Sequence, residues 1–171
     1  PKFTLGPKLT DEQIAFFDKN GFIHFQGVAS PEEVRAILKS TEEIQEKWIR
    51  DDVKVVNGVP IKYGIDENGK QIVHRFPFTS QFSEPVHNFV NSERVKCLTV
   101  LLPSGARIAE NEKDGVVFNH YVNTPNSNFR QMGWHTDSMR DIFYGKKVLP
   151  MLNVGLYFDD SSSDKGGLRI I

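Results

Sequence analysis

The residues best suited to chemistry lie in one stretch, Gln131 to Asp141, which reads Gln-Met-Gly-Trp-His-Thr-Asp-Ser-Met-Arg-Asp. His135 and Asp137 are separated by one residue, and on a β-strand the side chains at positions i and i+2 point to the same face. An imidazole nitrogen and a carboxylate oxygen would then face the same space. They would supply two thirds of the 2-His-1-carboxylate set that binds non-haem Fe(II) and leaves coordination positions open. The third ligand would be a histidine from a distant strand.

This pair is a weak signal when it is taken alone. The chain contains 5 His and 22 acidic residues, so chance spacing can produce a His-x-Asp pattern. The plain alternative is a histidine that is hydrogen-bonded to a nearby aspartate and binds no metal. The elements around the pair must therefore decide between the two interpretations.

Composition narrows the class of protein. A chain of 171 residues suits one domain with a real hydrophobic core. The net charge of −1 creates no overall field toward nucleic acid or an anionic membrane, and no apolar run approaches the roughly 20 residues of a membrane span. Cys97 is the only cysteine, which excludes an internal disulfide and favours a reducing compartment. With no secretory leader visible, we predict a cytoplasmic location, and Pro1, which cannot be an initiator, predicts missing N-terminal residues.

The first half of the chain predicts helices with clear start signals. Thr10 can cap a helix that Gln13 completes as a capping box and Gly21 ends. Ser30 and Pro31 open a second helix that continues through about residue 50. Residues 22–25 predict a strand, residues 53–63 a hairpin turning at Asn57-Gly58, and residues 71–76 a further strand. We expect residues 53–78 to form an excursion from the core, followed by two short helices that start near residues 83 and 92.

From Ala106 the pattern becomes that of strands. Segments 106–112, 116–122, the His135 segment, 148–160 and 166–171 all favour extended structure, which predicts a barrel or jelly roll. We therefore predict a single α+β domain over residues 1–171 with a mainly β core. Residues 1–105 would form the N-terminal helical part, packed on one sheet, and residues 106–171 the first part of the jelly-roll core. The last strand stops at Ile171, so we expect the C-terminal strands to be missing from this chain.

The chain resembles the phytanoyl-CoA dioxygenase family of Fe(II)/2-oxoglutarate oxygenases. The resemblance rests on three stretches: residues 9–34 with their helix-strand-helix pattern, Trp134-His135-Thr136-Asp137, and residues 156–171 with Asp159-Asp160 and Gly166-Gly167-Leu168. It implies a double-stranded β-helix of the cupin type. It also implies that His135 and Asp137 hold Fe(II), with 2-oxoglutarate as co-substrate and O2 as oxidant. The family's distal histidine and its 2-oxoglutarate-binding arginine would lie beyond Ile171.

Three asparagines are candidates for the surroundings of such a site. Asn119 and Asn123 share one face of a regular strand that precedes the His135 segment, and we expect them to contact 2-oxoglutarate or bound water. Asn153 lies in an otherwise apolar strand, where an unpaired amide would be costly, so we expect it to face the cavity as a third residue that contacts the 2-oxoglutarate cofactor. For Asn119 and Asn123 the alternative is capping of a loop or strand.

The resemblance implies hydroxylation of a small organic substrate, and we expect this substrate to be apolar or acyl. Related halogenases carry a small residue at the position of Asp137, so an aspartate there favours hydroxylation. Two other classes of function stay open: a jelly-roll binding or structural domain without metal, and a cupin-like enzyme that uses another divalent metal. The sequence leaves the oligomeric state undetermined.

Overall fold

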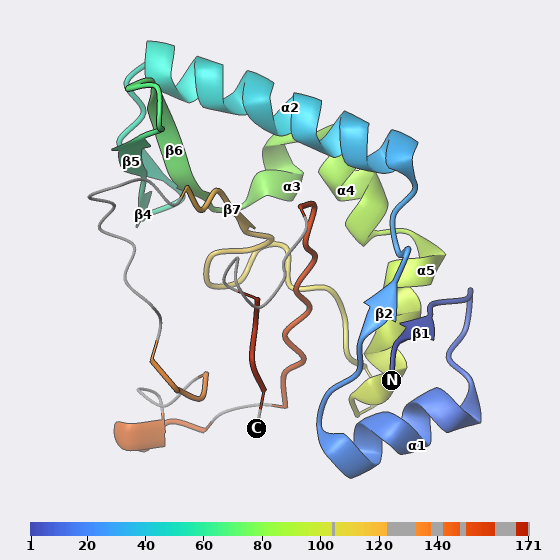
Figure 1. Cartoon of the computed structure of the whole chain (residues 1–171). Coiled ribbons are helices and arrows are strands. Elements are labelled where there is room, and N and C mark those ends of the chain that lie inside the picture. Colours follow the sequence, from blue (N-terminus) through green and yellow to red (C-terminus); the bar gives the residue numbers. More distant parts are fainter. Residues whose placement is uncertain (104, 123–132, 138–141, 148–149, 160–166, 171) are drawn as a thin grey trace.

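A computed structural model of the chain describes residues 1–103, 105–122, 133–137, 142–147, 150–159 and 167–170. The fold is of mixed α and β type, with small sheets and one long helix. That helix, α2 (Pro31–Arg50), runs along one side of the structure and contacts both α4 (Glu84–Val90) and β6 (Gln71–Phe76) (Figure 1). Both α4 and β6 therefore lie against α2.

The two N-terminal helices start as the sequence predicts. The Thr10 hydroxyl accepts a hydrogen bond from the Gln13 backbone N–H, and the Gln13 side-chain oxygen accepts one from the Thr10 backbone N–H, at the start of α1 (Asp11–Asn20). Gly21 ends α1 in the left-handed region, with φ of 73°. Ser30 and Glu33 form the same reciprocal cap at the start of α2. Each cap satisfies backbone donors that a helix N-terminus leaves without partners.

The strands found among the described residues form three separate small sheets. β1 (Phe3–Thr4) pairs in parallel with β2 (Phe25–Gln26), and β3 (Val55–Val56) pairs with β4 (Val59–Pro60) in the predicted hairpin. The third sheet is antiparallel, in the order β5 (Lys62–Ile65), β6, β7 (Phe118–Asn119). At Gly64 of β5 an added Cβ would lie 1.7 Å from His74 Nε2, so a larger residue there would displace the His74 ring.

Short helices follow β6 and complete the N-terminal part. They are α3 (Thr79–Phe82), α4, α5 (Glu93–Lys96) and a 3-10 turn, η1 (Cys97–Leu101). Ser83 caps α4 and Ser92 caps α5 through their hydroxyls. The sequence predicted one helix from Ser92 to Leu102, whereas the structure changes from α to 3-10 geometry at Cys97.

The core consists of two clusters of buried apolar side chains beneath α2. One cluster joins Ile44 and Trp48 of α2 to Val73 and Phe76 of β6. The second cluster joins Ile37 of α2 to the helices that follow, with members Val86, Phe89 and Val95. Val73 is 0% exposed. The prediction that residues 53–78 form an excursion therefore needs correction, because β6 supplies the centre of the first cluster.

The predicted run of strands after Ala106 is found only in part. The structure assigns β7 there, but the described residues 133–137 and 150–159 carry no strand, and the described part of the chain forms no barrel. A strand is defined by its ladder of hydrogen bonds to a neighbour, and extended residues without such a ladder are not assigned to a sheet. None of the helices among the described residues is both long and apolar enough to cross a membrane.

Candidate metal site

A hydrogen bond to the backbone of Gly133 orients the imidazole ring of His135. Its Nδ1 lies 2.9 Å from the carbonyl oxygen of Gly133. A carbonyl oxygen only accepts hydrogen bonds, so Nδ1 carries the proton and donates it. In the neutral ring the lone pair is then on Nε2, which is the nitrogen available to a metal ion.

Asp137 presents one carboxylate oxygen to that nitrogen. His135 Nε2 and Asp137 Oδ1 are 3.7 Å apart, and their side chains are 51% and 62% exposed. Two ligand atoms bound at right angles with bonds of about 2.1 Å would lie about 3 Å apart. The observed gap is therefore under an ångström from the spacing that one ion would require. The two groups face each other although residues 133–137 are not a regular strand.

Asn153 contacts the other oxygen of the same carboxylate. Its Nδ2 donates to Asp137 Oδ2 over 2.8 Å. The segment that carries Asn153 is anchored a few residues later, where Leu156 and Phe158 pack against the second core cluster and the Phe158 ring stacks on Phe118 at 5.7 Å. His135, Asp137 and Asn153, which are predicted from the sequence, are thus neighbours in the structure.

The other two predicted asparagines are not part of this group in the described structure. Asn119, on β7, is exposed, and its Oδ1 accepts a hydrogen bond from Arg75 over 3.2 Å. Arg75 also pairs with Asp114 at 2.7 Å. Asn123 lies outside the described residues. The expectation that these two asparagines contact 2-oxoglutarate is not tested by this arrangement.

The remaining histidines lie elsewhere. Among the residues that the structure describes, no group of three or more His, Cys, Asp and Glu side chains could hold a metal ion. His74 and His120 meet across β6 and the end of β7, where His74 Nδ1 lies 3.3 Å from the His120 carbonyl oxygen. Burial, and then the charge of His74, lower the pKa of His120.

Imidazole and carboxylate are both suitable ligands for Fe(II), so the chemistry of the His135–Asp137 pair fits this metal as a partial ligand set.

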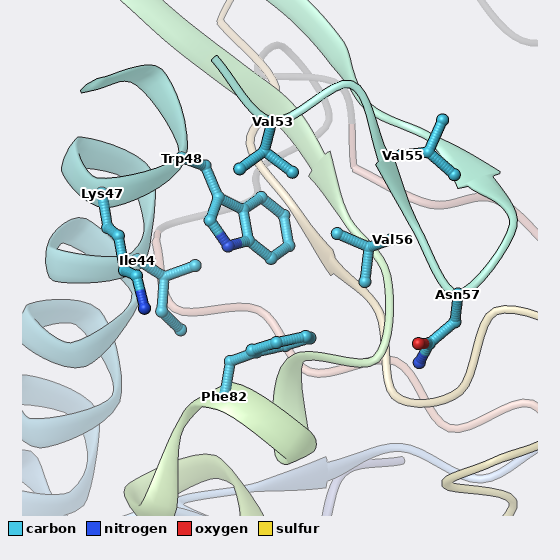
Figure 2. A pocket seen from close by; sticks show the side chains of 8 residues that line it. All are labelled: Ile44, Lys47, Trp48, Val53, Val55, Val56, Asn57 and Phe82. Carbon is cyan, nitrogen blue, oxygen red and sulfur yellow. The ribbon is translucent and has the colours of Figure 1, made fainter. Parts of the chain in front are cut away.

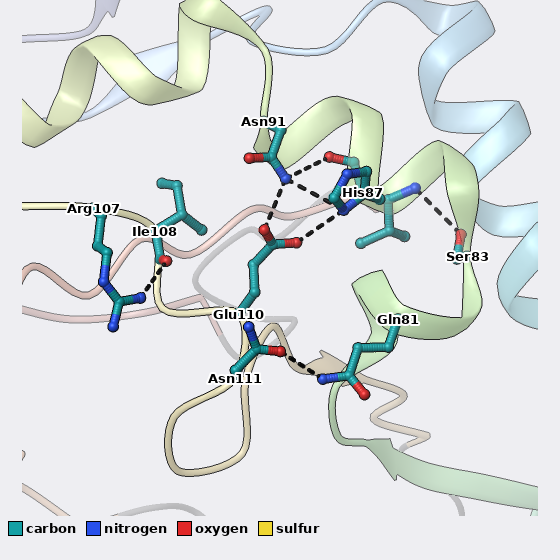
Figure 3. A network of polar contacts seen from close by, with 9 residues as sticks. Gln81, Ser83, His87, Asn91, Arg107, Ile108, Glu110 and Asn111 are labelled. Atoms are coloured by element: carbon teal, nitrogen blue, oxygen red, sulfur yellow. Dashed lines mark hydrogen bonds and ion pairs between the residues drawn. The ribbon is translucent and has the colours of Figure 1, made fainter.

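A polar network that the sequence did not predict joins α4 to the segment before β7 (Figure 3). Glu110 accepts hydrogen bonds from Asn91 at 2.9 Å and pairs with His87 at 3.1 Å. Burial raises the pKa of Glu110, but its polar side-chain neighbours, Asn91 and His87 among them, outweigh burial, so the net shift of the pKa is downward. Local sequence patterns relate residues that are only a few positions apart. They could not reveal the contact between His87 and Glu110, which are 23 positions apart.

One groove of the described structure contains none of these polar groups. It has a volume of about 420 Å³ and is bounded by α2, the β3–β4 hairpin and Phe82 (Figure 2). Its walls are mainly apolar and contain none of the five predicted site residues. It is lined by Ile44, Lys47, Trp48, Val53, Val55, Val56, Asn57 and Phe82.

The comparison with protein families gives a direct result. The model of the Phytanoyl-CoA dioxygenase (PhyH) family matches residues 17–171. The chain belongs to the phytanoyl-CoA dioxygenase family. Searches of curated proteins and of solved structures found no match. Members of this family are typically Fe(II)/2-oxoglutarate-dependent oxygenases that act on small molecules, so the family supports an oxygenase class for this chain.

Proposed function

We propose that this protein is a non-haem Fe(II) and 2-oxoglutarate-dependent dioxygenase that hydroxylates a small organic substrate. In the overall reaction, substrate, O2 and 2-oxoglutarate give hydroxylated product, succinate and CO2, which balances both oxygen atoms. The observation that carries the proposal is the approach of His135 Nε2 to Asp137 Oδ1 in a member of this family.

The residues of the chain have distinct roles in this proposal. His135 and Asp137 hold the metal, and the Gly133 carbonyl keeps the lone pair of His135 on Nε2. Bound Fe(II) with 2-oxoglutarate would supply the oxidising chemistry. Asn119 and Asn123 are proposed contacts of 2-oxoglutarate or of water beside it. We also propose that residues 1–171 belong to one domain with a cupin-type jelly-roll core, that the protein is cytoplasmic, and that its substrate is apolar or acyl.

An anaerobic titration of the full chain with Fe(II) and 2-oxoglutarate tests the metal site. The chelate should produce a weak visible charge-transfer band, which His135→Ala and Asp137→Ala should abolish because each removes a ligand. His24→Ala is the matched control, since His24 is an exposed histidine in the N-terminal part. The control should leave the band unchanged.

The same titration separates the alternatives. A wild-type protein without the band, or a His135→Ala variant that retains it, would contradict the proposal and favour a domain without metal. Turnover that needs a divalent metal but releases no succinate would instead indicate a cupin-like enzyme. Succinate release that depends on substrate, Fe(II) and His135 is the expected result.

A further inference from the structure

The two oxygens of the Asp137 carboxylate have different surroundings. Oδ1 faces His135 Nε2 at 3.7 Å, whereas Oδ2 accepts the hydrogen bond from Asn153 Nδ2 at 2.8 Å. We propose that Asn153 is a positioning residue that holds Oδ2, so that Asp137 offers only Oδ1 to the metal. This inference rests on the proposed metal site, and it replaces the expected contact of Asn153 with 2-oxoglutarate.

The chemistry of the amide suits this role. A hydrogen bond to an ionised carboxylate is shorter and stronger than one between neutral groups, and 2.8 Å lies in that range. An amide supplies the donor without adding a charge beside the metal ligands. An aspartate or glutamate in its place would bring a second negative charge toward Asp137. Side chains that hold metal ligands through such hydrogen bonds usually contribute to metal affinity.

Asn153 is exposed, but the segment that carries it is attached to the core. Leu156 and Phe158 attach its segment to the second core cluster, and the Phe158 ring stacks on Phe118 of β7. Asp137, by contrast, is 62% exposed, so packing does not fix the orientation of its carboxylate. The hydrogen bond from Asn153 therefore connects the exposed Asp137 carboxylate to a segment that is packed on the core, and it restricts the rotation of that carboxylate.

Binding through one oxygen has a consequence for the site. A carboxylate can bind a metal through one oxygen or through both. A 2-His-1-carboxylate site works by leaving coordination positions open. If Oδ2 also bound the metal, it would occupy one of them. By holding Oδ2, Asn153 favours the arrangement in which that position stays available.

The affinity for Mn²⁺ measures, without turnover, how well Asn153 positions the Asp137 carboxylate as a metal ligand. Mn²⁺ replaces Fe(II) and can be titrated in air, with electron paramagnetic resonance reporting the free ion. In the full chain, we expect Asn153→Ala to weaken Mn²⁺ binding by about 10- to 100-fold, and Asn153→Gln, which keeps the amide, to restore most of the affinity. Asn111→Ala is the matched control, because it also removes an exposed hydrogen bond between side chains, that from Gln81 at 2.8 Å.

The outcomes distinguish this inference from the proposed function. If His135→Ala binds Mn²⁺ as tightly as the wild type, the proposal that His135 and Asp137 hold the metal is wrong. If His135→Ala loses binding but Asn153→Ala retains wild-type affinity, the positioning role is overturned and the metal site stands. Thermal unfolding without metal checks the fold of each variant. If Asn153→Ala is less stable than Asn111→Ala, the Gln variant decides: restored affinity supports the positioning role, and lost affinity contradicts it.

Discussion

His135 shows how a single residue acquires a defined chemical state from its neighbours. The Gly133 carbonyl lies two residues earlier and accepts a hydrogen bond from the Nδ1–H group, so the backbone of the motif selects the tautomer. The one-residue spacing to Asp137 then brings the free Nε2 toward a carboxylate oxygen. The motif therefore orients its own donor atoms over five residues, without a regular strand.

The lowered pKa of a second histidine, His120, predicts how the free energy of unfolding depends on pH. Burial is the main cause that lowers its pKa below 6.5, and the charge of His74 adds to it, while Asp159 and Asp66 oppose the shift. The folded protein therefore keeps this ring neutral at a pH where the unfolded chain already binds a proton. The stability from this difference is present above pH 6.5 and is lost as the pH falls below 6.5 toward the folded pKa.

The variant His120→Gln isolates that contribution. Urea unfolding at pH 7.5 and pH 5.5 should show a larger loss of unfolding free energy for the wild type than for the variant, because glutamine binds no proton in this range. Equal losses in the two proteins would show that His120 does not cause the pH dependence. Carboxylates whose pKa is lowered, such as Glu110, act at more acidic pH and are common to both proteins.

At the scale of elements, α2 is the support on which the described fold is built. Its apolar face enters both core clusters, with Ile37 in one and Ile44 and Trp48 in the other. It also completes a strand, because the Gln45 side chain accepts a buried hydrogen bond from the Val73 backbone over 2.9 Å. That backbone donor would otherwise be buried without a partner in the middle of β6.

Gln45→Leu tests the bond between helix and sheet. Leucine fits the apolar surroundings but cannot accept the Val73 N–H, so we expect a loss of about 1–3 kcal/mol in unfolding free energy. Glu46→Leu, on the exposed face of the same helix, should change the free energy by less than about 0.5 kcal/mol. Urea denaturation of both variants makes the comparison. A loss no larger than that of Glu46→Leu would mean that water satisfies the Val73 donor.

At the scale of the whole molecule, metal binding and folding should be coupled. A ligand that binds only the folded state stabilises it, by about 2.7 kcal/mol at a concentration 100 times its dissociation constant. For a chain of this length that corresponds to a rise of roughly 5–10 °C in the melting temperature. Mn²⁺ should therefore raise the melting temperature of the wild type, and a chelator should reverse the rise.

The variant His135→Ala provides the control for this coupling. It should show no rise with Mn²⁺, because the proposed ligand is removed while the core clusters are untouched. An equal rise in the variant would place the bound metal elsewhere in the molecule. Calorimetry or fluorescence of Trp48, which is buried in the first core cluster, can follow the transition.

Local sequence determined the helices and tight turns, because their signals act over three or four residues. Both capping boxes, the Asn57-Gly58 hairpin and the Ser83 and Ser92 caps are confirmed. The family resemblance, carried by residues such as His135 and Asp137, is also confirmed, over residues 17–171.

Long-range pairing decided what the local patterns could not. Alternating residues predict a strand, but a strand exists only with a partner, and most of the segments predicted after Ala106 have none among the described residues. Only the tertiary structure placed β6 in the core, joined His87 to Glu110, and set Asn153 against Asp137. These contacts join residues that are far apart in the chain, so their geometry depends on how the core packs and not on local spacing.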